Sequence, residues 1–492
     1  MAPQRLVRKP RRRGFALILT ALMLVWILPL VGLAIDAGIL YAVKAQLQSA
    51  CDAAALAAAR NLSVGLTLSE QEASARARTE AFFDANFPTG HWETTGKSRQ
   101  VAVAESGFRT RKVTVSGSVT VPLFFMRTLG LSTSAVNASG QAARRDVNVM
   151  LVMDRSGSLE TAGACDDLET AAMSFVNSFA NGRDRLGLVT YGGSYRVDYA
   201  PTMNFKNSPT LASQIDLLYP GGCAGWTGSA QAIWKAYEEI VTINEPGALN
   251  VILFFTDGKP NSVTADWPLD VNGTPGNSDM TRCYDWEHGK YYYQSGYDPS
   301  ALTYRGYIAY DNGDDGIHGH QAGAMPTGDP GYVSIPNGYS GSSKSSSYDC
   351  WWRSNGSNVS RDVPFYPDND LYGNSMFGWK SVTTWSSGAY AGKVRYTSNN
   401  SGLNAAINAV DNAARRIRNR ELNAGIVTAI YAIGLGGAGE AEGDLLLRVS
   451  NDADSPIYDV NSPEGLYVYA PTASQLNQAF VRIASEILRY SQ

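Results

Sequence analysis

The stretch that decides the fold is VNVMLVMDRSGS, residues 147–158, in which an apolar run ends in acidic and hydroxyl-bearing side chains. The same kind of junction recurs in VILFFTDG, residues 251–258. Strands that are apolar throughout are typical of parallel sheets covered on both faces. Sheets of this kind bind ligands outside the carboxyl ends of their strands. Both stretches therefore predict buried strands that carry polar groups to one edge of a sheet.

Further strands and helices alternate from Asp146 onward. Apolar runs of strand length occur at 185–192 and 426–436. Segments with apolar residues at helical spacing lie between and after the strands, at 167–180, 229–243, 402–420 and 474–488. This alternation predicts an α/β domain with a doubly wound, mostly parallel sheet over residues 146–489.

Five oxygen-bearing side chains lie next to the ends of these elements. Asp154, Ser156 and Ser158 follow the first strand. Asp257 follows a later strand, and Thr227 precedes a helix in the turn PGGCAGWTGSA. A hard divalent cation prefers oxygen ligands and keeps several waters. The set predicts a site for Mg²⁺, or for Mn²⁺ or Ca²⁺, that can accept one more anionic ligand.

The pattern D-x-S-x-S, a distant threonine and a later aspartate together resemble the metal-ion-dependent adhesion site of von Willebrand factor type A domains. The resemblance covers residues 146–489, and it implies that the D-x-S-x-S residues form the first metal loop. Thr227 would then lie in the second loop and Asp257 in the third, with Ser229 as the alternative to Thr227. The resemblance also implies a protein partner that supplies an acidic residue to the metal.

A long insertion, residues 261–400, interrupts this domain directly after the third metal loop. It is rich in Gly, Ser, Asn, Asp and Tyr, and a structureless loop of this length is improbable unless it is functional. We expect it to lie over the metal-bearing edge. Its tryptophans form either a small core or a recognition surface, and they are Trp267, Trp286, Trp351, Trp352, Trp379 and Trp385. DNGDDG, residues 311–316, loosely resembles a calcium loop, so a second metal site in the insertion is an open alternative.

The N-terminal segment predicts a membrane anchor. Six basic residues precede Gly14, and GFALILTALMLVWILPLVGLAI, residues 14–35, carries no charge. At 1.5 Å per residue this run can cross about 30 Å of hydrocarbon. A cleaved signal peptide is the alternative, although its apolar region is shorter, at about 7–15 residues. The basic cluster predicts a cytoplasmic N-terminus and an external chain after Asp36.

Residues 36–60 continue as a helix with small side chains, which either docks on another helix or forms a plain stalk. The basic start, the apolar run, Asp36 and LQSACDAAALAAAR resemble the N-terminal segment of TadE/TadG-like proteins of Flp pilus assembly. Leu19 stands where prepilin processing after Gly14 would need a glutamate, so the TadG side fits better. The resemblance implies a bacterial inner-membrane protein whose bulk is periplasmic or extracellular.

A small β-containing unit is expected between the helix of residues 1–60 and the large domain. In KVTVSGSVTV, residues 112–121, valines alternate with polar residues, which is typical of a half-buried strand. Small residues after Leu131 predict a second strand. We expect residues 61–145 to form a short sheet packed on the stalk helix.

Several function classes are disfavoured. The net charge of −4 gives no support to nucleic acid as a partner. The glycines at 434–439 fit G-x-G-x-x-G, but on a late strand rather than on the first strand of a dinucleotide-binding unit. No nucleophile-elbow, phosphate-loop or zinc-helix pattern appears. The sequence therefore indicates a binding protein and not an enzyme.

The leading hypothesis is a TadG-like envelope protein that acts in Flp pilus assembly or surface adhesion through metal-dependent protein binding. Two alternatives stay open. One is a sensory or gating membrane protein that uses the type A domain to bind a partner. The other is an enzyme whose catalytic groups lie in the insertion.

The cysteine pairing follows from the compartment and the type A resemblance. Cys165 follows the first metal loop and Cys223 precedes Thr227, and type A folds place these loops side by side. We therefore expect Cys165 to pair with Cys223, and Cys283 with Cys350. Cys51 is left unpaired or links two chains.

Overall fold

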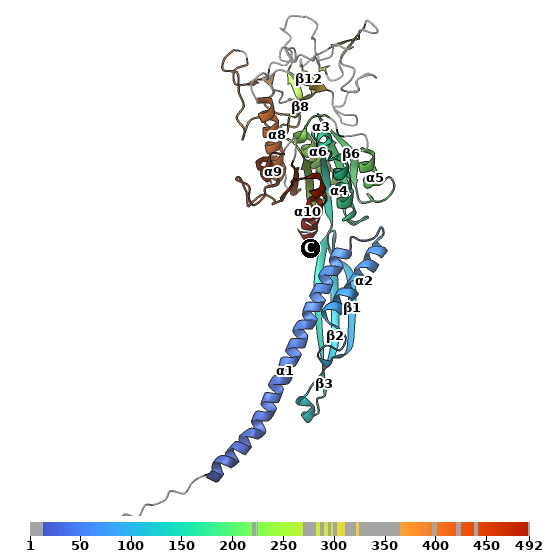
Figure 1. Cartoon of the computed structure of the whole chain (residues 1–492), viewed down its shortest axis with the longest axis vertical. Helices are drawn as coiled ribbons and strands as arrows, with labels where there is room; N and C mark the ends of the chain where they lie inside the picture. The colour runs from blue at the N-terminus through green and yellow to red at the C-terminus, as the bar shows by residue number, and fades with distance from the viewer. Residues whose placement is uncertain are drawn as a thin grey trace, which may run out of the picture. The chain divides into compact units, whose positions relative to one another are not determined.

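The computed structural model describes residues 13–218, 223, 225–268, 282–285, 290–293, 297–298, 303–309, 321–323, 365–388, 390–395, 401–419, 425–436 and 441–490. The chain divides into two compact units. One comprises residues up to Arg144 apart from residues 65–67, and the other comprises residues 65–67 and the chain from Arg145 onward. Figure 1 shows the helices and strands of both units.

The N-terminal unit contains helix α1, Arg13–Asn61, and helix α2, Leu68–Asn86. Within α1, the part from Leu19 is long and apolar enough to cross a membrane by length and composition. A three-stranded sheet completes the unit in the order β1 (Thr95–Gly107), β2 (Thr110–Pro122) and β3 (Thr133–Arg145). Short 3-10 helices are η1 (His91–Glu93) and η2 (Met126–Leu129).

The small-residue face of α1 packs inside its own unit. Ala50, Ala54 and Ala58 are buried in a core shared with α2 and with the valines of β2. A side chain at Gly140 of β3 would come within 2.5 Å of the backbone of Cys51, so the sheet and the helix approach as closely as backbones allow. Cys51 is buried and forms no disulfide with another cysteine of the described residues. The predicted packing of a sheet on the stalk helix is confirmed, and the helix also docks on α2.

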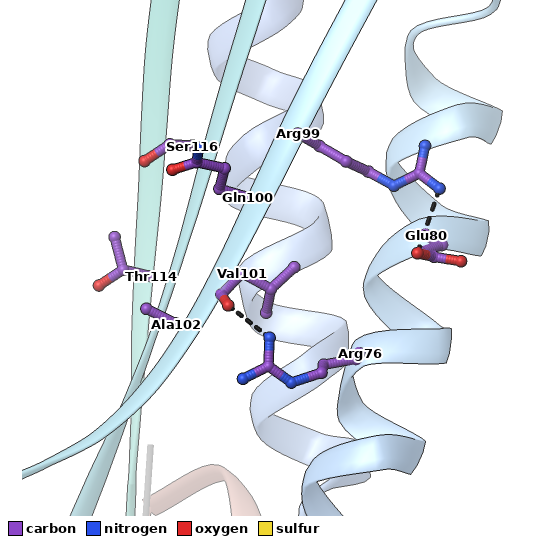
Figure 2. Close-up of a pocket in the computed structure, with 8 residues that line it drawn as sticks. All are labelled: Arg76, Glu80, Arg99, Gln100, Val101, Ala102, Thr114 and Ser116. Atoms are coloured by element: carbon purple, nitrogen blue, oxygen red, sulfur yellow. Dashed lines mark hydrogen bonds and ion pairs between the residues drawn. The ribbon is translucent and has the colours of Figure 1, made fainter.

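A hollow lies beside the half-buried sheet of this unit (Figure 2). The hollow has a volume of about 510 Å³ and lies beside α2, β1 and β2. Its two guanidinium groups already have partners. Arg99 pairs with Glu80 at 3.3 Å, and Arg76 donates to the Val101 carbonyl at 2.6 Å. Both guanidinium groups of the hollow are therefore held by contacts within the same unit.

The C-terminal unit is built on a six-stranded sheet. Its order is β17 (Tyr467–Ala470), β16 (Thr428–Leu435), β7 (Leu249–Thr256), β4 (Val147–Asp154), β5 (Arg185–Tyr191) and β6 (Tyr195–Thr202). Neighbours pair in parallel except β6, which runs antiparallel to β5. The predicted doubly wound, mostly parallel sheet is confirmed. The edge strand β6 is only half-buried and lacks the continuous apolar run on which the prediction rested.

Helices cover both faces of this sheet. One face buries α3 (Gly157–Thr161), α4 (Cys165–Asn177), α5 (Leu211–Leu218) and α10 (Leu476–Tyr490). The other buries α6 (Ser229–Ile243), α8 (Ser401–Arg418) and α9 (Gly443–Ser450). A short turn, η3 (Ala473–Gln475), leads into α10. Two apolar cores thus fix the central strands, and with them the loops at the carboxyl ends of β4 and β7.

The described part of the insertion contains short strands. They are β8 (Ser262–Pro268), β9 (Arg282–Asp285), β10 (Lys290–Tyr293), β11 (Tyr297–Asp298), β12 (Thr303–Ala309), β13 (Gln321–Gly323), β14 (Phe365–Tyr366) and β15 (Val394–Arg395). Trp267 is fully buried in a small core with Tyr366 and Met376. Trp379 and Trp385 are partly buried. Trp286, Trp351, Trp352, Cys350 and the 311–316 motif lie outside the described residues, so the Cys283–Cys350 pairing stays a prediction.

Candidate metal centre

The first loop is organised around the carboxylate of Asp154, the last residue of β4. Its Oδ1 accepts a hydrogen bond from the backbone N–H of Ser156 at 2.7 Å. Its Oδ2 accepts from the hydroxyls of Thr256 at 2.8 Å and Tyr191 at 3.1 Å. Because these donors come from β7 and β5, on either side of β4, the parallel sheet itself fixes the orientation of this buried carboxylate. Tyr191 and Thr256 were not singled out in the sequence, where they read as ordinary residues at the ends of strands.

The two serines of the first loop meet Asp257 from the third loop. Ser158 Oγ donates to Asp257 Oδ1 at 2.8 Å, and Ser156 Oγ lies 3.3 Å from the same oxygen. The two serine hydroxyls are 3.0 Å apart. Asp257 Oδ2 is buried and has no hydrogen-bond partner among the described residues. Four of the five predicted ligands therefore come together in one hydrogen-bonded cluster.

Thr227 reaches the same region through its backbone. It is buried, and its N–H donates to Asn261 Oδ1 at 2.7 Å. Its carbonyl accepts from the N–H groups of Asn261 at 3.1 Å and Ser262 at 3.3 Å. The second loop also meets the first where the Gly157 N–H donates to the Gly225 carbonyl at 3.1 Å. Asn261, which was not among the predicted site residues, holds Thr227 against the chain that leaves the third loop.

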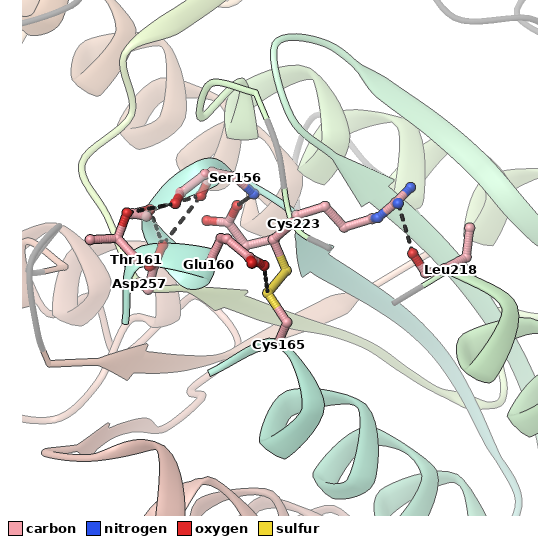
Figure 3. The surroundings of a disulfide bond; sticks show 11 residues. Ser156, Glu160, Thr161, Cys165, Leu218, Cys223 and Asp257 are labelled. Carbon is pink, nitrogen blue, oxygen red and sulfur yellow. Dashed lines mark hydrogen bonds between the residues drawn. A yellow bond between two sulfur atoms is a disulfide. The ribbon is translucent and has the colours of Figure 1, made fainter. Parts of the chain in front are cut away.

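A disulfide bond joins Cys165 to Cys223, as the sequence predicted (Figure 3). Cys165 begins α4, just after the first loop, and Cys223 lies in the second loop. Arg155 adds a second connection by donating to the Leu218 carbonyl at 2.7 Å. The loops that carry the serines and Thr227 are therefore tied together covalently as well as by hydrogen bonds.

The cluster is an unfavourable place for negative charge. Burial, together with the nearby charge of Asp257, raises the pKa of Asp154 to about 7, although hydrogen bonds from Ser156 and Thr256 oppose the shift. Burial also raises the pKa of Asp257, against the hydrogen bonds from the two serines. Two buried carboxylates that share one site repel each other, and a bound cation relieves that repulsion.

The start of the insertion contacts this edge of the domain. Ser262 Oγ donates to the carbonyl of Gly193 in the turn between β5 and β6. The hydroxyls of Ser194 and Thr264 lie 2.9 Å apart. The first residues of the insertion are thus attached to the loops next to the cluster, and the position of the insertion as a whole stays a prediction.

The donor set is rich in hydroxyls and poor in charge. Among the described residues no group of three or more His, Cys, Asp and Glu side chains is placed to hold a metal. Asp154 and Asp257 are the only carboxylates among the five predicted ligands. Asp257 Oδ2, which has no partner within the described part of the chain, and the adjacent serine oxygens fit a hard, oxygen-preferring cation.

Two family models match the chain, in this order. Residues 14–61 match a family described as putative Flp pilus-assembly TadE/G-like, and residues 148–272 match the von Willebrand factor type A domain. The chain therefore carries a TadE/G-like segment followed by a type A domain, as the sequence predicted. No curated protein matches the chain.

Some solved structures are also similar to this chain. The PilB minor pilin from Streptococcus sanguinis is 14% identical, with a TM-score of 0.34 over 80% of this chain and 79% of that chain. The vWF domain of the type V pili tip protein Mfa5 from Porphyromonas gingivalis is 15% identical, with a TM-score of 0.33 over 71% of this chain and 98% of that chain. A von Willebrand factor type A protein from Catenulispora acidiphila is 10% identical, with a TM-score of 0.31 over 80% of this chain and 51% of that chain.

Proposed function

We propose that this chain is a membrane-anchored, extracytoplasmic binding protein of a Flp-type pilus system. It acts in pilus assembly or surface adhesion and not in catalysis. In this proposal Asp154, Ser156, Ser158, Thr227 and Asp257 hold a divalent cation, Mg²⁺ or else Mn²⁺ or Ca²⁺. A protein partner, such as a pilus component, supplies an acidic side chain to that cation.

The observation that carries the proposal is the buried carboxylate of Asp257. One of its oxygens receives both serine hydroxyls, and the other has no partner among the described residues. A buried acceptor left without a partner costs about 1–3 kcal/mol, and more if it is charged. A cation at this position offsets that cost and the repulsion from Asp154.

The cation supplies Lewis acidity, through which it attracts an anionic ligand from outside the chain. The protein's own groups prepare that contact. Thr256 and Tyr191 hold Asp154 in one orientation, and the disulfide keeps the second loop beside the first. Because three of the five proposed ligands are neutral hydroxyls, the ion keeps most of its positive charge for the partner.

The anchor part of the proposal rests on α1 and on the TadE/G-like match. The helix presents apolar side chains outward over most of 19–35, where Leu22, Val25 and Leu30 are each more than half exposed. Such a surface is stable in hydrocarbon and unstable in water. Six basic residues before Gly14 favour a cytoplasmic N-terminus by the positive-inside rule.

Calorimetry with Mn²⁺ on the full chain in detergent micelles tests the site. We expect Asp154→Ala to weaken binding by at least about 100-fold, since it removes one of two charged ligands. Ser158→Ala changes the fold less and should weaken binding by about tenfold. Asp444→Ala, an exposed acidic residue in the first turn of α9, is the matched control and should bind like the wild type. Unchanged Mn²⁺ affinity in both site variants would refute the metal assignment.

A fusion assay tests the topology. Alkaline phosphatase fused after Gln492 is active only outside the bacterial cytoplasm, so the proposal expects an active fusion. A stable but inactive fusion would contradict the proposed orientation, whatever the calorimetry shows.

A genetic test addresses the biological role. In the source bacterium, deletion of the gene should reduce piliation or surface attachment. Wild-type protein should restore it, and an Asp154→Ala variant that is expressed to the same level should not. Normal piliation and attachment in the deletion strain would contradict the role in pilus assembly and adhesion.

A further inference from the structure

The turn between β2 and β3 carries an exposed apolar cluster. Residues 123–132 read LFFMRTLGLS, and four large side chains there are about half exposed or more. They are Phe124, Phe125, Leu129 and Leu131, and we name the turn of residues 123–132 the hairpin tip. Four adjacent apolar side chains are an unfavourable surface in water and mark an interaction site.

The tip is fixed to the end of the apolar part of α1. Asp36, the first charged residue after that run, is 1% exposed. Its carboxylate accepts hydrogen bonds from the backbone N–H groups of Phe124 and Phe125 at 3.0 Å and of Met126 at 2.7 Å. A carboxylate with three such donors is a well-satisfied connection. The position of the tip along α1 is therefore set by the residue at which the apolar run ends.

One side chain of the tip lies against the apolar run itself. A side chain at Gly32 would come within 2.6 Å of Phe125 Cβ, so the glycine leaves the space that Phe125 occupies. Gly32 precedes Asp36 by four residues, which is about 6 Å along a helix. The tip thus lies beside the last turn of the segment proposed to cross the membrane. Val31, Leu33 and Ile35 of that turn are also largely exposed.

Most backbone N–H groups of the tip have hydrogen-bond partners within the protein. Besides the three N–H groups bound to Asp36, the N–H of Thr128 donates to the Phe125 carbonyl, and that of Gly130 to the Arg127 carbonyl, each at 3.1 Å. The N–H of Leu131 donates to the Met126 carbonyl, also at 3.1 Å. Irregular backbone is tolerated at membrane depth only when its polar groups are satisfied by protein or water.

We propose that the hairpin tip inserts into the outer leaflet of the lipid bilayer, beside the exit of α1, as a second membrane contact of the N-terminal unit. The inference rests on the proposed anchor. Arg127, exposed within the tip, can extend toward lipid phosphates while the apolar side chains enter the acyl region. The contact restrains α1 because Asp36 joins the helix and the tip.

A fluorescent label measures the depth of the tip. The full chain with Leu129→Cys, labelled with an environment-sensitive NBD group, is reconstituted into phosphatidylcholine–phosphatidylglycerol vesicles with or without spin-labelled lipid. Phe108→Cys is the matched control, since Phe108 is 61% exposed and lies in the β1–β2 turn at the other end of the same 13-residue strands. Phe124→Cys gives a second tip position, and the unmutated chain reports any labelling of the native cysteines.

We expect blue-shifted NBD emission at both tip positions and at least threefold quenching by spin-labelled lipid, with neither at Phe108. Emission and quenching at the tip equal to those at Phe108 would overturn the inference. A blue shift without lipid quenching would place the tip against protein and would also overturn it. Flotation of the vesicles separates the two proposals. A chain that does not float refutes the anchor and the tip together, whereas a floating chain with an unquenched tip refutes the tip alone.

Discussion

Asp36 and Asp257 are both buried, at 1% and 2% exposure, yet their carboxylates are used in opposite ways. Asp36 accepts three backbone N–H groups and joins a helix to a turn. Asp257 accepts two serine hydroxyls on one oxygen and leaves the other without a partner among the described residues. A buried carboxylate whose hydrogen bonds are satisfied stabilises the fold, whereas a partly satisfied one has an acceptor that a ligand can satisfy. The contact of Asp36 with the β2–β3 turn is therefore structural by itself, and the loops that carry the proposed metal ligands depend on further support.

The largest loss of stability is expected when the disulfide bond between the first and second loops is removed. Cys165 and Cys223 are 58 residues apart, and closing such a loop contributes about 4 kcal/mol in the chain-entropy model. The double variant Cys165→Ser with Cys223→Ser should lose most of this in urea unfolding measured in EDTA. Serine in place of buried Cys51 serves as the comparison, because it removes a thiol but no cross-link. A double variant as stable as the wild type would show that hydrogen bonds alone hold the loops.

A smaller loss of stability is expected at Asp36, where α1 is joined to the β2–β3 turn. Asp36→Ala removes the acceptor of three N–H groups and should cost about 2–3 kcal/mol of local stability. Hydrogen exchange followed by mass spectrometry should show the peptide containing residues 124–126 exchanging roughly 30- to 100-fold faster. Peptides from the β1–β2 turn should be unchanged. Equal protection of the tip in both proteins would mean that Asp36 does not hold it.

A substitution at the proposed metal ligand Asp257 should change stability in the opposite direction, because it should stabilise the metal-free protein. In EDTA, Asp257→Asn removes a buried charge beside Asp154 and should raise the free energy of unfolding by about 1 kcal/mol. In Mn²⁺ the order should invert, because only the wild type gains stability from binding. Thermal unfolding of both proteins under both conditions measures this crossing. Destabilisation of the variant in EDTA would place Asp257 in the structural class with Asp36.

The smallest effect concerns pH. The folded-state pKa of Asp154 is about 7, above its ordinary value of 3.8, so between these values the folded state binds more protons than the unfolded state. Stability in EDTA should therefore fall as the pH rises, by about 1 kcal/mol between pH 6 and pH 8. Saturating Mn²⁺ should remove this dependence, since the metal requires the deprotonated carboxylate. Stability in EDTA that rises over this range would contradict the shifted pKa of Asp154.

Much of the fold could be predicted from periodicity. The runs at 147–154 and 251–258 predicted β4 and β7, because strands buried on both faces need apolar residues throughout. The same rule missed β6, which is half-buried at the sheet edge, and β1, whose pattern is mostly polar. These strands form because a neighbouring strand supplies backbone hydrogen bonds. Such pairing does not require a particular pattern of apolar residues, so the sequence does not reveal it.

The acidic and hydroxyl-bearing residues of the candidate site could be predicted from the sequence. The residues that hold them in place could not. The spacing of D-x-S-x-S and the aspartate after β7 placed four side chains at one sheet edge, where the structure joins them by hydrogen bonds. Tyr191, Thr256 and Asn261 escaped notice because their roles depend on which strands and loops become neighbours. For Thr227 the structure gives backbone contacts, and its part as a ligand remains a proposal.

The sequence by itself determined the order of the parts and the chemistry available to each. These are an apolar helix, a small sheet, and an α/β domain with acidic and hydroxyl groups after its strands. Only the tertiary structure decided which polar groups are satisfied, because a hydrogen bond between residues 36 and 126, or 158 and 257, depends on distance in space and not in sequence. That difference separates a carboxylate that locks a turn from one left with an unpartnered oxygen.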